Sequence, residues 1–324
     1  MNTFSIKRYT KEDFLQWNDF VARHHRATFL FHRDFMDYHS DRFVDHSLLV
    51  HRDNKLLAIL PANHQGNSVY SHAGLSYGGV LISRKCNFSV GVNIYEALLK
   101  FLENEGIENL YIKGMPLIYN SSIDESEALI FNWLNADIER IDTYSYIDLQ
   151  YFSGPNRNRS RALKVAKGKG LEVRISHDLE TFWNNILKPN LRSRFGVNPV
   201  HSLDEISMLQ ERFHDQIQLF AAFHGNEMKA GAIIFVTDNV AHFQYSSGLD
   251  DRAEDGALDL LFSEVISNFS QKQYISFGSS MEKEGNAVNR GLLYWKESFD
   301  AKMAVQRFYH LQTKNHILLK NRLV

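Results

Sequence analysis

Residues 219–236 read LFAAFHGNEMKAGAIIFV, which is two apolar runs separated by the turn-forming pair Gly225-Asn226. Two such runs around a two-residue turn signal predict a β-hairpin. The first half of the chain has the same arrangement, because residues 48–60 read LLVHRDNKLLAIL around Asp53-Asn54. The two turns lie 172 residues apart, from position 53 to position 225, which indicates that one structural unit occurs twice.

The segments after each hairpin also follow the same order. Each half continues with a strand-like segment, a helical segment with apolar residues on one face, and a short strand closed by glycine. They span residues 68–75, 92–102 and 110–114 in the first half, and 241–249, 258–269 and 274–278 in the second. Hairpin, strand, helix and strand predict tandem α/β units rather than a bundle or a sandwich. We therefore expect two domains, residues 1–150 and residues 151–324.

A region of helical character precedes each copy, at residues 11–46 and 178–214. In the second region, Ser202 is followed three residues later by Glu205, which predicts a capping box at the start of a helix that runs through Phe213.

The composition excludes several classes of protein. Of the 324 residues, 44% are hydrophobic and only 5 are proline, which is typical of a globular chain. The net charge of -2 disfavours a protein dedicated to duplex DNA. The single cysteine, Cys86, excludes an internal disulfide and a cysteine-rich metal site, and it is typical of a reducing compartment. We therefore expect a cytoplasmic protein.

A membrane span is not expected. Residues 56–83 lack Asp, Glu, Lys and Arg and are long enough to cross a bilayer, but they include Pro61 and four glycines, so buried sheet is the better interpretation. The first residues, 1–9, also lack the apolar run of a signal peptide.

The order of elements resembles the GNAT acyltransferase fold, and two such units in one chain resemble the Fem family of peptidoglycan aminoacyltransferases and their acetyltransferase-like relatives. The resemblance implies two tandem GNAT-like units, each a mixed, largely antiparallel sheet flanked by helices. The residues that carry it are Gly225-Asn226 with Ala230-Gly231, Phe243–Ser246, Gly256-Ala257, Phe277–Ser279 and the run Gly291–Phe299, together with the glycine-rich segment Ser71–Gly79 of the first half.

Two departures from this resemblance leave the acyl donor open. Fem enzymes that act on cell-wall precursors often carry a coiled-coil arm, and no sustained heptad pattern occurs here. GNAT enzymes hold the coenzyme A pyrophosphate at a helix N-terminus. The nearest match is the turn with Arg252, Gly256 and Ala257, which lacks one glycine and has acidic neighbours. The sequence therefore leaves two candidate acyl donors. One is acyl-coenzyme A, as a co-substrate rather than a tightly bound cofactor, and the other is an aminoacyl-tRNA.

Acyl transfer to an amine requires a base for the amine proton, donors for the oxyanion and an acid for the leaving group. Lys296, next to Trp295, is the first candidate, with a surface lysine as the alternative. Tyr245 is a candidate acid or donor, with a core tyrosine as the alternative. His72 is a candidate base because histidine titrates near neutral pH, and a structural histidine is its alternative.

Further residues are candidates for substrate binding. Tyr77 and Trp295 are expected to line the groove, and Glu282 and Asn289 to orient an amine, with roles in surface loops as the alternative. Residues 153–170 include six Lys and Arg and no acidic residue, and Arg157, Arg161 and Lys164 share one helix face. Such a face suits phosphate in a nucleotide, a tRNA or an anionic membrane surface, and a solvated surface is the alternative.

Two motifs that would indicate a more specific kind of site do not meet the structural requirements of that site. Residues 74–78 match the G-x-S-x-G nucleophile elbow, but the chain continues as strand instead of turning into a helix. His25, His32, His39 and His46 recur every seven residues, a spacing of about 10.5 Å on a helix, which is too long for two of them to share a zinc ion. We therefore predict no metal site.

The sequence as a whole predicts an N-acyltransferase that acts on an amine of a small, nucleotide-linked or cell-envelope-precursor acceptor. Aminoacyl-tRNA-dependent transfer and a non-catalytic binding protein of the same fold remain the alternatives.

Overall fold

The computed structural model describes residues 4–122, 124–249, 256–282 and 285–323. Its contacts divide the chain into two compact units, Met1–Asp142 with Val305–Val324, and Thr143–Ala304. The chain passes from the first unit to the second within β9 (Asp137–Asp148) and returns within β17 (Lys302–Gln312). The expected division at residue 150 did not include this return of the last residues to the first unit.

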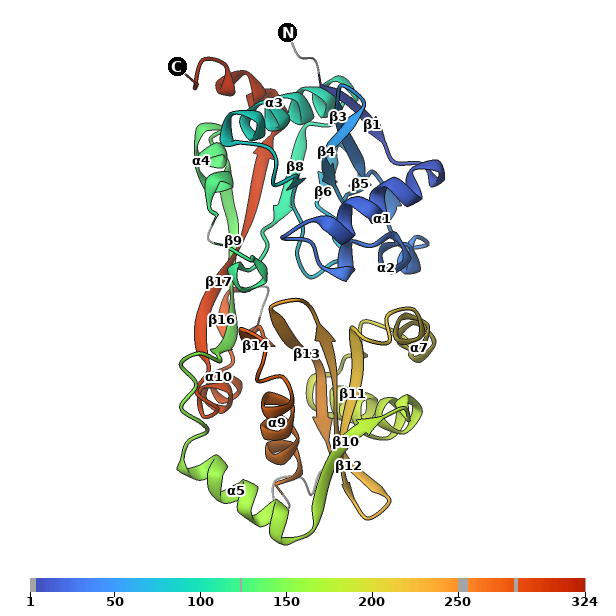
Figure 1. Cartoon of the computed structure of the whole chain (residues 1–324), viewed down its shortest axis with the longest axis vertical. Coiled ribbons are helices and arrows are strands. Elements are labelled where there is room, and N and C mark those ends of the chain that lie inside the picture. The colour runs from blue at the N-terminus through green and yellow to red at the C-terminus, as the bar shows by residue number, and fades with distance from the viewer. Residues whose placement is uncertain (1–3, 123, 250–255, 283–284, 324) are drawn as a thin grey trace. The chain divides into compact units, whose positions relative to one another are not determined.

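The second unit contains one mixed sheet (Figure 1). Its strand order is β10-β11-β12-β13-β14-β9, and every neighbouring pair is antiparallel except the parallel pair of β13 and β14. The hairpin predicted around Gly225-Asn226 is β11–β12. The bounds are β10 (Leu171–Ser176), β11 (Ile217–His224), β12 (Glu227–Val236), β13 (Val240–Gly248) and β14 (Tyr274–Gly278), with a short pair formed by β15 (Met281–Glu282) and β16 (Ala287–Val288).

Helices flank this sheet. They are α5 (Arg157–Gly168), a π-helical turn (Thr181–Leu187) that continues into α6 (Lys188–Phe195), α7 (Leu203–Arg212), α9 (Ala257–Asn268) and α10 (Arg290–Glu297). The predicted capping box is confirmed, because Ser202 N donates to Glu205 Oε2 at 2.7 Å and Glu205 N donates to Ser202 Oγ at 3.1 Å. The start of α9 at Ala257 is also confirmed.

The core of the second unit lies between α9 and the sheet (Figure 1). Phe262 of α9 stacks on Phe243 of β13 with ring centroids 4.0 Å apart. On β12, a Cβ at Gly231 would lie 2.3 Å from a ring carbon of Phe182 in the π-helical turn. Only glycine therefore lets this turn pack so closely on the sheet.

The first unit has two groups of strands. Strands β1 (Ser5–Arg8), β3 (Leu48–Arg52), β4 (Lys55–Leu60) and β7 (Leu81–Ile82) form an antiparallel sheet in the order β1-β3-β4-β7. The predicted hairpin is β3–β4, and Asp53 and Asn54 have the positive φ angles of a tight turn, +50° and +59°. The other strands, in the order β17-β8-β6-β5-β2, are β8 (Asn109–Lys113), β6 (Ser68–Tyr70), β5 (Asn63–Gln65) and β2 (Val44–Asp45), and β6 and β8 are parallel.

The helices of the first unit are α1 (Phe14–Arg23), α2 (Arg33–Met36), α3 (Phe88–Asn104) and α4 (Ser126–Trp133), and short 3₁₀ turns lie at Lys11–Asp13, Phe29–Phe31, Asp37–His39, Leu117–Tyr119 and Thr313–Leu319. The predicted helix is α3, which packs Val92, Leu98 and Leu102 into the core. Gly106, at φ +79°, follows its end as expected.

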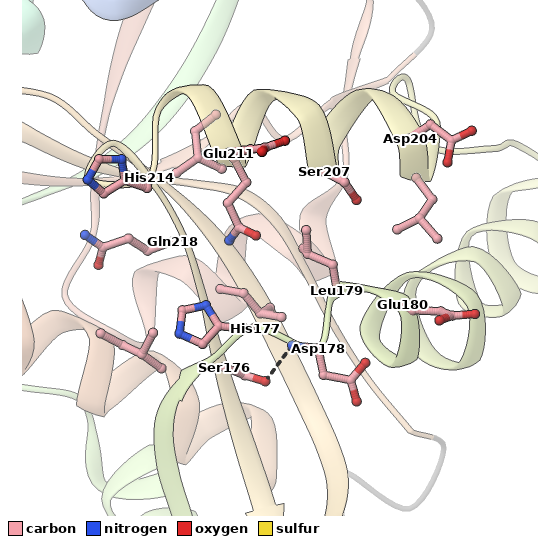
Figure 2. A pocket seen from close by; sticks show the side chains of 15 residues that line it. Ser176, His177, Asp178, Leu179, Glu180, Asp204, Ser207, Glu211, His214 and Gln218 are labelled. Atoms are coloured by element: carbon pink, nitrogen blue, oxygen red, sulfur yellow. Dashed lines mark hydrogen bonds between the residues drawn. The ribbon is translucent and has the colours of Figure 1, made fainter.

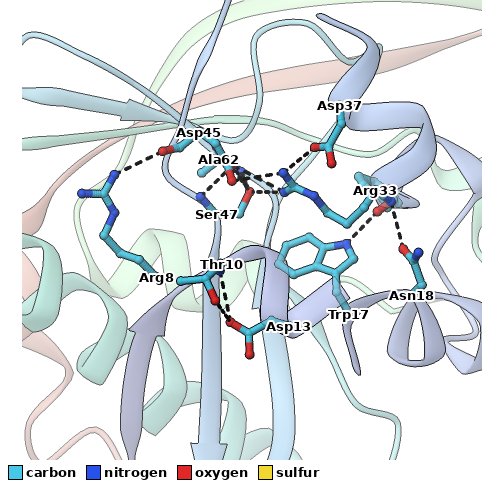
Figure 3. Close-up of polar contacts among 11 residues, drawn as sticks. Arg8, Thr10, Asp13, Trp17, Asn18, Arg33, Asp37, Asp45, Ser47 and Ala62 are labelled. Atoms are coloured by element: carbon cyan, nitrogen blue, oxygen red, sulfur yellow. Dashed lines mark hydrogen bonds and ion pairs between the residues drawn. The ribbon is translucent and has the colours of Figure 1, made fainter. Parts of the chain in front are cut away.

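A buried arginine joins the helical region of this unit to its strands (Figure 3). Arg33, 4% exposed, donates to Asp45 at 3.1 Å and to Asp37 at 2.5 Å, and its guanidinium lies 3.8 Å from the ring centroid of Tyr9. Because its carboxylate partners compensate the buried charge, the cluster is structural.

The tandem α/β organisation with mixed, largely antiparallel sheets and flanking helices is therefore confirmed.

Candidate active site

The candidate site lies where β13 and β14 stop pairing in the second unit. The two strands pair over Val240–His242 and Tyr274–Ser276, and β13 then continues to Gly248. In its pairing with β12, Tyr245 lies opposite Ile233 and Phe243 opposite Ile234, so Gln244 is the extra residue of a β-bulge. A bulge bends the strand and increases its twist. Sheet geometry therefore opens a space at this end of β13.

A cavity of about 320 Å³ lies at this position. It is bounded by α6, the end of β13, the first turn of α9, and α10. Its lining is largely apolar, and Asn190 fixes one wall by donating to Ser247 Oγ at 2.8 Å and to the Gly248 carbonyl at 2.6 Å. The lining residues are Leu187, Asn190, Leu191, Arg194, Phe195, Ser246, Ser247, Gly248, Leu258, Leu292 and Trp295.

Trp295 separates this cavity from the core of the unit. Its ring packs edge-on against Phe262, with centroids 4.6 Å apart, and lies 5.1 Å from Phe299. The same residue lines the cavity, and its role in substrate binding stays a prediction.

Lys296, the next residue of α10, is 3% exposed. Its Nζ donates to the Ser279 carbonyl at 2.7 Å and to the Gly278 carbonyl at 3.0 Å, both at the exit of β14. Among the described residues, no carboxylate forms an ion pair with it, and burial lowers the pKa of its amine to about 7. Burial therefore disfavours the charged form of this amine and brings its titration into the neutral range.

His242 was not among the predicted residues. Its side chain is partly buried, its Nδ1 lies 3.0 Å from Ser276 Oγ, and a Cβ at Gly278 would lie 3.3 Å from its ring. Burial lowers the pKa of His242 to about 4, and the charge of Lys296 acts in the same direction. A histidine within a strand of aromatic and small residues was the available signal, but nothing local distinguished it from a core residue.

Tyr245 lies on β13 and points into a packed environment. Its hydroxyl lies 2.6 Å from His201 Nδ1, and its ring packs edge-on against Trp183 at 5.1 Å. Burial raises the pKa of Tyr245 to about 12. These contacts match the core-tyrosine alternative. The main hydrogen-bond partner of the hydroxyl is the His201 side chain rather than a backbone group.

Glu282 and Asn289 lie together at the start of α10. Asn289 Nδ2 donates to Glu282 Oε1 at 2.6 Å, and Asn289 Oδ1 accepts from Leu292 N at 2.9 Å as the helix N-cap. The pair therefore orients the helix that carries Lys296.

The basic helix α5 exposes Arg157, Arg161 and Lys164 as predicted. Arg159 instead turns inward and donates to both oxygens of Asp259, at 2.8 and 2.9 Å, in the first turn of α9.

The predicted anion turn lies partly in the described chain. Arg252 lies outside the described residues. Gly256 is the N-cap of α9 at φ +66°, and a Cβ there would lie 2.6 Å from the Ala162 carbonyl of α5. This start of α9 is thus covered by α5 and carries the Asp259 carboxylate.

The remaining two candidates belong to the first unit. His72, at φ +64°, is 4% exposed and stacks on His39 at 4.8 Å, and burial lowers its pKa to about 3. Tyr77 is 3% exposed, and its hydroxyl lies 3.0 Å from Thr28 Oγ1. A histidine with so low a pKa is a weak base at neutral pH, and Tyr77 is a core residue.

A second cavity of the second unit, about 620 Å³, lies between the end of β10, the loop after it and α7 (Figure 2). Leu179, Ile217 and Leu219 contribute apolar surface, and the carboxylates are Asp178, Glu180, Asp204 and Glu211. The predicted site residues that the structure describes do not line it.

Within the described ranges, no group of three or more His, Cys, Asp or Glu side chains has an arrangement that could hold a metal ion. None of the helices in the described part of the chain is long and apolar enough to cross a bilayer.

Comparison with known proteins gives the class of fold. No family model matches the chain, and no curated protein matches its sequence. A crystal structure of FemX superposes with a TM-score of 0.68 at 9% identity, covering 98% of this chain and 99% of that one. The C-terminal domain of a putative lysylphosphatidylglycerol synthetase from Agrobacterium fabrum superposes with a TM-score of 0.59 at 13% identity, covering 92% and 91%.

L-PGS from Bacillus licheniformis, with a TM-score of 0.54, 11% identity and coverage of 81% and 85%, has the same fold. The chain therefore has the fold found in FemX, and the predicted resemblance is confirmed for the fold.

Proposed function

We propose that this protein is an N-acyltransferase whose reaction centre is the cavity between β13, α6, α9 and α10. The observation that carries the proposal is Lys296, an amine buried without a counter-ion among the described residues, with a pKa of about 7, in the residue that follows Trp295 of the cavity wall. Because perturbed titratable groups concentrate at functional sites, this lysine is the best candidate for proton transfer in the second unit.

The hydrogen bonds of Lys296 allow its ammonium form to donate a proton and its neutral form to accept one. An ammonium has three donors, and two are used by the Gly278 and Ser279 carbonyls. The third is left for the developing oxyanion or for the leaving group. In the neutral amine, the two N–H groups keep these carbonyls and the lone pair can accept a proton.

The reaction forms an N–C bond between the acceptor amine and the acyl carbon and breaks the bond from that carbon to the sulfur or oxygen of the donor. The amine nitrogen loses one proton, and the thiolate or alkoxide that leaves gains one. Apolar walls such as Leu191, Leu258 and Trp295 would exclude water that would otherwise hydrolyse the donor.

Acyl-coenzyme A is the proposed donor. Over Phe243–Ser247, the edge of β13 that is turned away from β12 has no strand partner among the described residues. An extended thioester arm with amide groups can bond to such an edge as an added strand. The cavity at the end of this edge then receives the acyl group.

Aminoacyl-tRNA is the second candidate, because specific observations favour it. The start of α9, where a pyrophosphate would bind, is covered by the Ala162 carbonyl and carries Asp259. The exposed Arg157, Arg161 and Lys164 of α5 present positive charge to a nucleic acid backbone.

We propose an amine of a small, nucleotide-linked or cell-envelope-precursor acceptor, acylated in the cytoplasm. One similar structure is named as a domain of a putative lysylphosphatidylglycerol synthetase. This name supports an envelope-related acceptor.

Thermal unfolding with each donor tests these proposals. Stabilisation by acetyl-coenzyme A supports the first donor, stabilisation by aminoacyl-tRNA supports the second, and stabilisation by neither supports a non-catalytic binding protein of this fold. The donor that binds is then used to measure acylation of a panel of amines.

Variants test the role of Lys296. The change Lys296→Met removes the amine, and Lys272→Met is the matched control, because Lys272 Nζ also donates to two backbone carbonyls, those of Thr237 and Asp238, at a less buried position. We expect turnover to fall by about 10² or more in Lys296→Met and to stay within about twofold in the control. Unchanged turnover in a folded Lys296→Met protein would show that the assignment is wrong.

A further inference from the structure

Three large apolar side chains are exposed close together on the second unit. Phe195 at the end of α6 is 60% exposed, and Val197 and Val200 in the following loop are 51% and 75% exposed. Single exposed apolar residues are common on protein surfaces, but three within six residues of the sequence make this segment a candidate interaction surface. We call residues 188–200 the α6 tip.

Along the sequence, the charged residues of the α6 tip and of its neighbours have one sign. Residues 181–203 contain no Asp or Glu, whereas the α6 tip contains Lys188, Arg192 and Arg194. Arg192 and Arg194 are exposed. The nearest carboxylates in the sequence are Glu180 and Asp204, which lie directly before and directly after residues 181–203.

The α6 tip has a defined shape. Gly196, at φ +67°, ends α6, and its N–H donates to the Arg192 carbonyl at 3.1 Å. Arg192 Nε donates to Asn198 Oδ1 at 2.9 Å and so ties the loop to the helix. Pro199 restricts the backbone before Val200. The apolar side chains are therefore exposed on a preformed loop, and little order has to be gained on binding.

We propose that the α6 tip binds the surface of an anionic lipid bilayer, with Phe195, Val197 and Val200 entering the boundary between headgroups and acyl chains and Arg192 and Arg194 contacting lipid phosphates. Interfacial segments of soluble proteins combine an apolar face with flanking basic residues in this way. A nucleic acid matches the basic residues, but its backbone offers nothing to the exposed valines and phenylalanine. A bilayer satisfies both sets.

The α6 tip is continuous with the candidate active site. Leu191, Arg194 and Phe195 line the cavity as well as belonging to the tip. A bound bilayer would therefore lie beside the cavity mouth, and the acceptor amine would be carried by a lipid or a lipid-linked molecule. This last step rests on the proposed function, whereas the binding surface does not.

Vesicle flotation of the full chain tests the surface without any acyl donor. We expect the protein to float with vesicles of equal parts phosphatidylcholine and phosphatidylglycerol and to bind phosphatidylcholine vesicles at least about tenfold more weakly. The triple change Phe195→Ser, Val197→Ser and Val200→Ser is expected to weaken anionic vesicle binding by about tenfold or more. The control Leu15→Ser, at a residue of α1 that is 78% exposed, is expected to bind as the unchanged protein does.

A fluorescent reporter keeps the proposal testable if the triple variant is unstable. Because Cys86 is the single cysteine, Cys86→Ser with Val200→Cys allows one environment-sensitive dye to be attached at the tip, and Cys86→Ser with Leu15→Cys places the same dye on α1. A blue shift with anionic vesicles is expected at position 200 and not at position 15.

Several results would overturn the proposal. The first is that the triple variant binds anionic vesicles as strongly as the unchanged protein does, and the second is that the dye at position 200 shows no blue shift with these vesicles. The third is that tRNA, and not vesicles, shifts the emission of this dye. The fourth is that the protein forms a dimer in solution that the triple change dissociates. If the unchanged protein binds vesicles but shows no acyltransferase activity, that result would instead count against the proposed function.

Discussion

Replacing Lys296 by methionine should change how the stability of the protein depends on pH. Burial lowers the pKa of Lys296 from 10.5 in the unfolded chain to about 7. Between these two values the unfolded chain holds a proton that the folded chain has released. The free energy of unfolding therefore rises with pH through this window, because the unfolded state binds more protons.

The size of the effect follows from the two pKa values. A difference of about 3.5 units corresponds to about 5 kcal/mol over the full window, at about 1.36 kcal/mol per unit. From about pH 6 to about pH 9, linkage gives a rise of about 2.7 kcal/mol in the free energy of unfolding relative to Lys296→Met. The hydrogen bonds lost from Gly278 and Ser279 add a constant that cancels in this comparison.

Urea unfolding of both proteins across this pH range measures the difference. Leu292→Ala is the control, because it alters α10 without removing a titratable group, and its effect should be the same at each pH. If the difference between the unchanged protein and Lys296→Met is flat from about pH 6 to about pH 9, the amine titrates in its ordinary range and the reasoning is wrong.

Other changes test the packing around the site. Tyr245→Phe removes the hydrogen bond between the tyrosine hydroxyl and His201 Nδ1 and should cost about 1–2 kcal/mol in urea unfolding. Turnover should change by less than about tenfold, and a loss of about 10³-fold in a folded variant would restore Tyr245 as a catalytic acid. Gly231→Ala places a methyl group against Phe182 and should destabilise the protein by about 1–3 kcal/mol. Gly168→Ala, which meets nothing within 4 Å, should be neutral or stabilising, and equal effects of the two changes on the thermal midpoint would contradict this packing.

The local elements were predictable because short segments determine them. Asp53-Asn54 and Gly225-Asn226 form the expected turns, since turn chemistry depends on two or three neighbouring residues. The capping box at Ser202 and the helix start at Gly256 are local for the same reason. The recurrence of these signals at a distance of about half the chain then predicted the tandem organisation.

The site itself depended on contacts between distant residues. The sequence places Lys296 beside Trp295, but the carbonyl partners of its amine are 17 and 18 residues away, at the end of another strand. The contact that favours a core role for Tyr245 comes from His201, 44 positions away. The sequence around His242 did not distinguish it from a core residue, because its environment comes from β14 and α10.

The amino-acid sequence by itself determined where the hairpins and helices begin and that one α/β unit occurs twice, because these depend on turn residues, capping and periodicity. Only the tertiary structure decided that residues 305–324 return to the first unit, that α5 covers the start of α9, and that the Lys296 amine is buried without a counter-ion among the described residues. The physical reason is that burial and hydrogen-bond partnership arise from elements far apart in the chain, so that the pKa of a single lysine depends on the packing of the whole unit.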